Sequence, residues 1–400
     1  MRHAKVRSSS TPRGLTLLVL AILALTSATT GTYASFDQAS SSDICSTIED
    51  VQFDGTRANA SVTWQVELGP RLPGSNASAE LRTTITTDLE SLGYDVRTQT
   101  HERYGMELTN LFARWPSNST ETGQLVLSAH YDSRNVADQD ENETNQSLPV
   151  PGANDAASGV AVLLELARHI PGMDLDYDVV LFFNDAEDQQ PKYTLGAEAW
   201  AENLTEEEIN ATHAFVLLDM VGDADLQLHD IAPGNATLKS RVVELGTSLG
   251  LVNGTTGCNG EAGLDVLHYD TTVHVLDDHV HAHNLGIPAI DIMDTSFGVA
   301  KPYTFGSYWH TMEDTPDKVS ADSLSNVGRL VELGLRTDAF VGINPSQEAA
   351  AHDGSSTDDK HEVDAPEENS NRNTGLAVLA FAGLVSILGL LVMVEIKGKR

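Results

Sequence analysis

Histidines and acids that could bind a metal follow apolar segments at several points of the chain: His130, Asp155, Glu187, Asp188, Asp219 and His310. Zinc accepts imidazole nitrogens and carboxylate oxygens together, because its filled d shell imposes no preferred geometry. Two imidazoles and three carboxylates suffice for a pair of zinc ions with a bridging water. Adjacent acids after a strand point to different sides, so Asp188 can bind metal while Glu187 exchanges a proton with the water.

The segment 124–188 predicts the elements that position these side chains. Two short apolar runs, Leu125–Leu127 and Val179–Phe183, are typical of strands buried on both faces. Between them, apolar residues recur at the spacing of one helix face: Val160, Leu163, Leu164 and Ala167. A strand, a helix and a second strand in this order predict a parallel crossover unit.

The chemically active residues fall at the ends of these predicted strands. His130 ends the first strand, Asp155 lies in the Gly-rich loop that opens the helix, and Glu187 follows the second strand. Ligands collect at the carboxyl ends of parallel strands, where the loops diverge. Each residue alone is more often a helix cap or a structural histidine. The set, on successive strand ends, favours a metal site.

The remaining periodicity predicts further strands and helices, as expected of an α/β fold. Further strands are expected near 93–96, 108–115, 214–219 and 286–292, and helices near 81–92, 197–203, 237–249 and 320–340. The turn-rich residues 69–75 should cap the helix that follows them. The acidic insertion 137–148 is too polar for a core and should be a surface loop near the site. The stretch 45–64 gives only a weak signal.

The two ends of the chain have the composition of export and anchoring segments. Residues 1–34 combine basic residues, a short apolar run and a small-residue cleavage site, as in a secretory signal peptide. Residues 375–394 are uncharged and long enough to span a membrane, and the basic tail 395–400 should stay cytoplasmic. The acidic linker 344–373 should be disordered. We therefore expect a single-pass membrane protein whose catalytic domain, 45–343, lies outside the cell. An uncleaved anchor at the first segment and a buried core helix at the second are the alternatives.

The acidic composition limits the partners of the protein. The 24 basic and 58 acidic residues give a net charge of −34, which excludes the basic patch that nucleic-acid binding needs. Such a surface favours a halophilic source, where salt screens its self-repulsion, with a preference for cationic partners as the alternative. Glycosylation sequons agree with export: Asn59, Asn76, Asn118, Asn142, Asn145, Asn203, Asn210, Asn235 and Asn253. For the only two cysteines, Cys45 and Cys258, the sequence leaves a disulfide and free thiols equally open.

Five ordered motifs carry a family resemblance: AHYDS, PGANDAASG, FFNDAED, LLDMVG and YWHTMEDTPDKVS. They resemble those of the zinc aminopeptidase family that includes aminopeptidase Y, glutamate carboxypeptidase and the animal glutaminyl cyclases, and the likeness covers residues 69–340. It implies a three-layer α/β/α sandwich around a mixed, mostly parallel central sheet of eight strands, with Asp155 bridging two zinc ions and Glu187 as general base. The other implied ligands are His130, Asp188, Asp219 and His310. Asp188 stands where the family more often has Glu.

A zinc aminopeptidase that hydrolyses N-terminal residues of extracellular peptides is the function we expect from this resemblance. The alternative is the glutaminyl cyclase branch, which keeps one zinc and forms N-terminal pyroglutamate. The segments WHTM at 309–312 and LDDH at 276–279 resemble that branch, and Asp277 falls on one of its proton-handling positions with Asp219 and Glu187. Against it, Leu276 replaces a polar residue, Asp291 replaces a His of the animal enzymes, and no Trp lies in 189–196.

Two further interpretations are less specific. A non-catalytic binding ectodomain would be recognised by a purified protein without zinc, although here all five ligands and the base are present. The tract His279, His281 and His283 looks like a metal motif, but on a helix only the first and last share a face. We expect surface or supporting roles for these histidines. The oligomeric state is open.

Overall fold

The computed structural model describes residues 41–119, 123–343 and 395–396. The predicted signal peptide 1–34, the linker 344–373 and the predicted membrane helix 375–394 lie outside the described residues, as does most of the basic tail. Among the described residues, no helix combines the length and the apolar character needed to cross a membrane.

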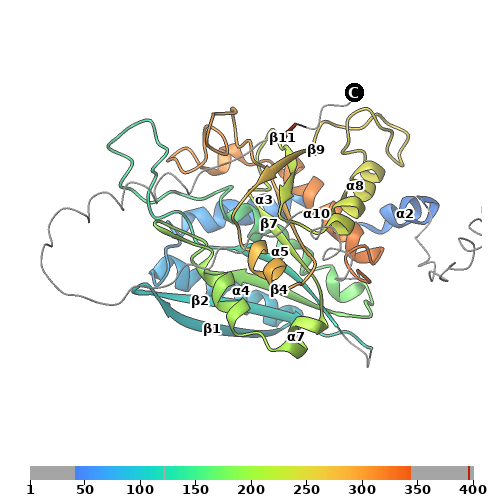
Figure 1. The fold of residues 1–400 in the computed structure, drawn as a ribbon, viewed down its shortest axis with the longest axis horizontal. Coiled ribbons are helices and arrows are strands. Elements are labelled where there is room, and N and C mark those ends of the chain that lie inside the picture. Colours follow the sequence, from blue (N-terminus) through green and yellow to red (C-terminus); the bar gives the residue numbers. More distant parts are fainter. Residues whose placement is uncertain (1–40, 120–122, 344–394, 397–400) are drawn as a thin grey trace, which may run out of the picture. The chain divides into compact units, whose positions relative to one another are not determined.

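Six strands form the central sheet in the order β1-β2-β4-β3-β7-β10. Strands β1 and β2 lie at one edge (Figure 1). Their bounds are β1 Asp95–Arg103, β2 Met106–Trp115, β3 Gln124–His130, β4 Asp178–Asn184, β7 Thr212–Asp219 and β10 Ala289–Met293. The strands β4, β3, β7 and β10 run parallel, whereas β1 and β2 form an antiparallel edge. The mixed, mostly parallel sheet that the sequence predicts is confirmed.

The eight-stranded sheet implied by the family resemblance is not what this chain forms. Strands β8 (Leu228–Ala232) and β9 (Leu267–His274) belong to a separate sheet with β11 (Glu395–Ile396). The physical reason is that β8 meets the end of β10 only through one isolated bridge, Leu228 with Asp294, so no continuous ladder joins the two sheets. A two-residue hairpin, β5 (Asp188–Gln189) with β6 (Lys192–Tyr193), lies beside the site.

Alternating side chains of the parallel strands build an apolar core on each face of the sheet. In β3, Leu125 and Leu127 join the larger core, and Val126 between them joins the smaller one. In β4, Leu181 and Phe182 divide in the same way. This alternation shows why the two runs are apolar at every position, since both faces are covered.

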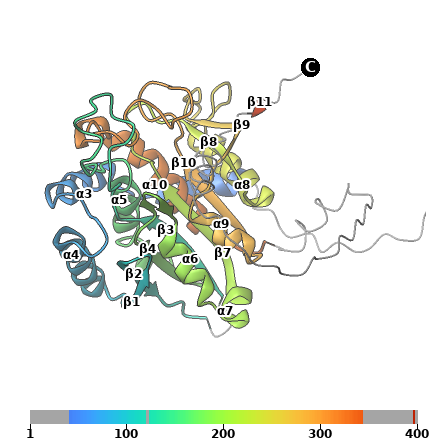
Figure 2. The same ribbon diagram turned by 60° about the vertical axis from the view of Figure 1, so that its left-hand side comes forward.

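Helices cover both faces, which gives the three-layer sandwich (Figure 2). On one side lie α3 (Gly55–Glu67), α4 (Asn76–Leu92), α5 (Ala157–Leu166) and α10 (Ala321–Arg336). On the other lie α6 (Leu195–Glu202), α7 (Glu206–Ala211) and α9 (His279–Asn284). The predicted helices at 81–92, 197–203, 237–249 and 320–340 correspond to α4, α6, α8 (Ala236–Leu249) and α10 within a few residues at most ends. Ser75 caps α4 by accepting a hydrogen bond from the Ser78 amide, as the turn-rich lead-in predicts.

The weak stretch 45–64 contains two helices that sequence periodicity missed, α2 (Ser41–Thr47) and α3. In α3 only Ala58 and Val62 are fully buried apolar residues, while Trp64 and Val66 pack partly exposed against the core, so the helical stripe is too thin to recognise. A local signal was present at Asp54, whose carboxylate caps the helix by accepting from the Thr56 and Arg57 amides. Packing against α5 and α10 holds the helix in place.

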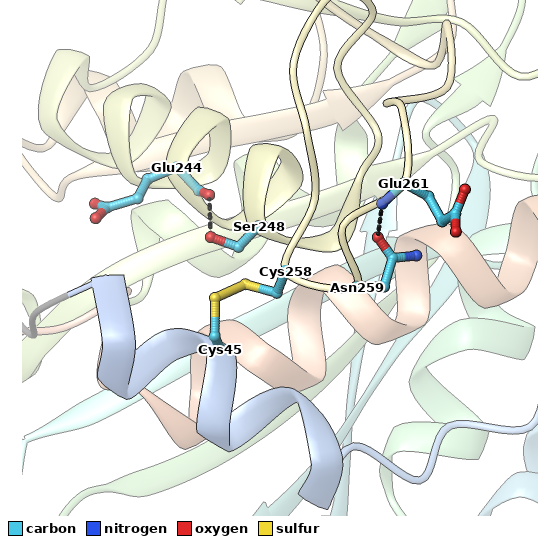
Figure 3. The surroundings of a disulfide bond; sticks show 6 residues. All are labelled: Cys45, Glu244, Ser248, Cys258, Asn259 and Glu261. Atoms are coloured by element: carbon cyan, nitrogen blue, oxygen red, sulfur yellow. Dashed lines mark hydrogen bonds between the residues drawn. A yellow bond between two sulfur atoms is a disulfide. The ribbon is translucent and has the colours of Figure 1, made fainter.

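A disulfide between Cys45 and Cys258 answers the question that the sequence left open (Figure 3). It joins α2 to the loop after α8, with 5.4 Å between the two Cα atoms. The bond closes a loop of 213 residues, and a link of this length removes much entropy from the unfolded chain. We expect it to stabilise the fold by about 2–5 kcal/mol.

Candidate metal centre and active site

Strand register places His130 beside Asp219. Ser128 in β3 pairs with Leu217 in parallel strand β7, so two residues further along each strand the chain reaches His130 and Asp219 at the same level. The His130 Nε2 atom lies 3.2 Å from an Asp219 carboxylate oxygen. Both strands end here, and Met220 (φ 51°) turns the chain away in the left-handed region that side chains disfavour.

The loop before α5 carries Asp155 to the same point. Asp314 holds this loop, because its carboxylate accepts hydrogen bonds from the amides of Ala153, Asn154 and Asp155. Gly159, in the first turn of α5, allows the helix to approach β7 so closely that any Cβ would collide with the Leu218 backbone. The Gly-rich sequence therefore fixes the position of Asp155.

Asp155 stands between two histidines. Its Oδ1 atom lies 3.1 Å from His130 Nε2, and its Oδ2 atom lies 3.7 Å from His310 Nε2. On the second side, His310 Nε2 is 3.0 Å from Asp188 Oδ2. All five predicted ligands thus form two triads that share Asp155: His130, Asp155 and Asp219, and Asp155, Asp188 and His310.

The triads fit zinc by the chemistry and spacing of their donor atoms. Tetrahedral ligands about 2.0–2.1 Å from one Zn²⁺ are about 3.4 Å from each other, close to the separations within both triads. Asp155 Oδ1 and Asp188 Oδ2 are buried and face the Nε2 atoms of His130 and His310, without a donor of regular hydrogen-bond geometry among the described residues. Acceptor oxygens without donors are costly in a protein interior, and a cation would satisfy them. That these residues are the ligands stays a prediction.

A second carboxylate faces the far ring nitrogen of each histidine. Asp132 Oδ1 lies 3.4 Å from His130 Nδ1, and Asp138 Oδ1 lies 3.5 Å from His310 Nδ1. Carboxylates in this position orient metal-binding imidazoles and raise their basicity. Neither acid is among the site residues that the sequence predicts. The signal for Asp132 was its place in the AHYDS motif, and Asp138 lies in the acidic insertion, which does lie next to the site.

Arg134 is a buried cation that is also absent from the predicted site residues. Its Nη1 atom lies 2.5 Å from Asp188 Oδ1, and its guanidinium packs on the Tyr193 ring. Burial alone would raise the pKa of Asp188, but His310 and Arg134 lower it to about 2. Because Arg134 occupies one oxygen, Asp188 has a single oxygen left for a metal ion.

Glu187 is placed by its backbone rather than by its carboxylate. The Glu187 and Asp188 amides each donate to one oxygen of Asp132 at 3.0 Å, after a left-handed turn at Ala186 (φ 60°). Burial raises the pKa of Glu187 well above its usual value, and the negative charges of Asp188 and Asp219 raise it further, against the effect of His130. A raised pKa suits a group that must take up and release a proton near neutral pH.

These residues line a cavity of about 500 Å³. Its acidic floor includes Asp155, Glu187, Asp188, Asp219 and Asp277. The remaining wall is largely apolar and aromatic, with Val275, Leu276, Val280, Tyr303, Phe305 and Trp309. The indole of Trp309 stacks on the His310 ring with 3.5 Å between the ring centroids.

Asp277, the second predicted catalytic acid, lies buried in the loop after β9 and borders the same cavity. Burial raises its pKa well above the usual value, and Asp291, Asp219 and Glu187 raise it further through their negative charges. All predicted site residues except His130 therefore border one cavity, and His130 contacts two of its lining residues, Asp155 and Asp219.

The model of Peptidase family M28 matches residues 110–333. The chain is 24% identical over 319 residues to the glutaminyl-peptide cyclotransferase of Boiga dendrophila, covering 70% of this chain and 81% of that protein.

Two solved structures share the fold. The glutaminyl cyclase of Porphyromonas gingivalis aligns with a TM-score of 0.60 and 29% identity, covering 70% of this chain and 96% of that one. A Zn-dependent exopeptidase from Parabacteroides distasonis ATCC 8503 aligns with a TM-score of 0.61 and 25% identity, covering 73% and 99%. With a family match over more than half of its length and a mixed α/β sheet flanked by helices, this chain belongs to Peptidase family M28.

Proposed function

We propose that this chain is a zinc-dependent aminopeptidase that hydrolyses the N-terminal residue of peptides. The observation that supports this most is the position of Asp155, whose two oxygens face two separate triads. A shared carboxylate between two three-ligand sets is suited to a pair of zinc ions, and a metal pair can stabilise both the attacking and the leaving group of a hydrolysis.

The residues of the chain have distinct tasks in this reaction. Zinc, when bound, supplies Lewis acidity for the scissile carbonyl and acidifies water. Glu187 takes the proton of the attacking water and returns it to the leaving amine, which its raised pKa favours. Asp132 keeps Glu187 and Asp188 on their separate sides by holding both amides.

The lining of the cavity suggests which substrates it accepts. Glu187 and Asp277, the acids of this cavity that the two zinc ions would leave free, would attract the free amino group of a peptide and repel an acidic first side chain. The wall formed by Leu276, Phe305 and Trp309 offers apolar contact to that side chain. We therefore expect faster release of uncharged apolar residues than of Asp or Glu.

Product analysis tests the proposal. The full chain, in high salt with zinc, would be offered an aminoacyl chromogenic amide and a peptide that begins with Gln, and the products would be identified by mass. Free amino acid from both substrates is the expected result. A Gln peptide that loses only the mass of ammonia, with the amide left intact, would contradict the aminopeptidase proposal.

That second outcome would identify a glutaminyl cyclase, which we propose as the second candidate. It is favoured by Asp277, a buried acid close enough to Glu187 and Asp219 for their charges to raise its pKa. Hydrolysis needs one base, whereas moving a proton from the attacking amine to the leaving amide would use such a group of acids. The cyclase reading predicts a single zinc ion, held by Asp155, Asp188 and His310.

We also propose that the protein works outside the cell, anchored to the membrane through residues 375–394. The Cys45–Cys258 disulfide supports an oxidising compartment. Protease treatment of intact cells, followed by detection of the catalytic domain, tests this location. Full protection of that domain in intact cells would contradict it.

A further inference from the structure

A third group of ligating side chains lies behind the cavity, and neither triad uses it. It consists of Asp277 in the loop after β9, His279 at the start of α9 and Asp291 in β10, each with a ligand atom within 4.8 Å of the others. All three residues are at most 2% exposed. His279 Nδ1 lies 3.6 Å from Asp291 Oδ2.

The hydrogen bonding of His279 determines which of its nitrogens is free. The Nε2 atom lies 3.0 Å from the carbonyl oxygen of Pro233, and because a carbonyl only accepts, Nε2 must carry the hydrogen. In a neutral imidazole with its hydrogen on Nε2, the Nδ1 atom carries none. The Nδ1 atom therefore presents a bare lone pair toward Asp291.

The surrounding oxygens supply no donor. His279 Nδ1, both carboxylate oxygens of Asp291 and Asp277 Oδ2 are buried and form no hydrogen bond with any other part of the chain that the structure describes. The other Asp277 oxygen accepts from the Asp278 amide. Four acceptor atoms thus face one another in a region without water-exposed surface. Either a proton or a metal cation must lie between them, because desolvated acceptors and charges cost free energy unless they are paired.

We propose that Asp277, His279 and Asp291 bind a divalent cation of the zinc class, separate from the ions of the two Asp155 triads. One imidazole and two carboxylates are a ligand set that Zn²⁺ accepts, and the charge of the ion cancels that of the two acids. The ion would connect the loop after β9 and the start of α9 to β10 of the central sheet. It would also fix Asp277, whose side chain borders the cavity.

A proton shared between Asp277 and Asp291 is the competing explanation, and it predicts a different metal content. The cation explanation requires an additional metal ion per chain that depends on Asp291. The shared proton requires none. Counting metal ions therefore separates the two without any measurement of activity.

The experiment uses the full chain, stripped with chelator, loaded with zinc alone, separated from free metal and analysed for zinc per chain. Asp291→Asn, which nearly preserves the side-chain volume, should lower the content by one ion relative to the unaltered chain. His310→Gln, which alters only a triad, should leave the ion at Asp277, His279 and Asp291 in place. An unchanged zinc content in Asp291→Asn would overturn the proposal.

A second measurement covers the case in which Asp291→Asn folds poorly. His130→Gln combined with His310→Gln weakens both triads. When this double variant has been stripped with chelator, added zinc should still raise its Tm. Adding His279→Gln, whose amide can still donate to Pro233, should abolish that rise. A zinc-induced rise that persists in this triple variant would refute the site. Failure of the proposed aminopeptidase function would appear instead as absent turnover with the Asp291-dependent ion still bound.

Discussion

The two sides of Asp155 present similar donor sets on very different supports. On one side, His130 and Asp219 end neighbouring parallel strands, and the sheet register alone sets their separation. On the other side, Asp188 and His310 belong to a short hairpin and a loop. His310 itself lies in the left-handed region at φ 55°, which requires support from its surroundings.

The difference shows how a metal site can be held without regular structure. The loop side has two additional partners, Arg134 on Asp188 and Asp138 on His310, both outside the sheet. The strand side has Asp132, which also holds the Glu187 and Asp188 amides. Asp132 therefore serves both sides, whereas Asp138 serves only one.

We expect the largest effect at Glu187, which belongs to neither triad. Glu187→Gln keeps the shape of the side chain but cannot accept a proton, so turnover should fall by about 10²–10⁴-fold. Zinc content should stay at the level of the unaltered chain. Parallel measurement of rate and bound zinc checks both, and appreciable residual turnover would remove Glu187 from the role of base.

Removing the shared carboxylate should affect both sides together. Asp155→Asn should lose the ions of both triads, while His130→Gln and His310→Gln should each lose one. Zinc per chain after gel filtration is the measurement. An unchanged zinc content in Asp155→Asn would contradict the assignment of one ion to each triad. An unchanged content in His130→Gln would also contradict it, because a single ion on the His310 side would then explain the binding.

Substitutions of Asp138 and Asp132, the acids that face the two histidines, should separate effects on zinc affinity from effects on the free energy of unfolding. Asp138→Asn should weaken zinc binding on the His310 side by about 10–100-fold with little change in the free energy of unfolding. Asp132→Asn should weaken binding similarly and also destabilise the fold by about 1–3 kcal/mol, because it disturbs buried hydrogen bonds. Zinc titration and urea unfolding of both variants test this. Equal stability of the two would contradict the shared role of Asp132.

The smallest effect concerns acid pH in the zinc-free chain. The pKa of Asp188 is about 2 in the fold and 3.8 as an ordinary value, so its ionised form stabilises the fold. This contribution is fully present above pH of about 4 and is lost as pH falls toward 2. The difference in unfolding free energy between the chelator-treated chain and its Asp188→Asn variant should shrink over that range. A difference that stays constant would refute the assignment.

Much of the site could be read from local patterns. Apolar runs that end at His130, before Glu187 and at Asp219 indicated parallel strands, and parallel strands bring their carboxyl ends to one edge. The family motifs added the roles of Asp155 and His310. The helix α3 was missed because its buried stripe is thin, and the eight-stranded sheet was wrong because β8 and β9 pair elsewhere.

The sequence by itself determined which side chains gather at the sheet edge, because strand and helix periods act over a few neighbouring residues. Only the tertiary structure decided what surrounds them: Arg134 on Asp188, Asp314 beneath the Asp155 loop, and the disulfide from Cys45. These contacts join residues that lie 54 to 213 positions apart in the sequence. Several of the residues lie in loops, which show no periodic pattern. Their geometry follows from the packing of whole elements, and a local pattern carries no information about it.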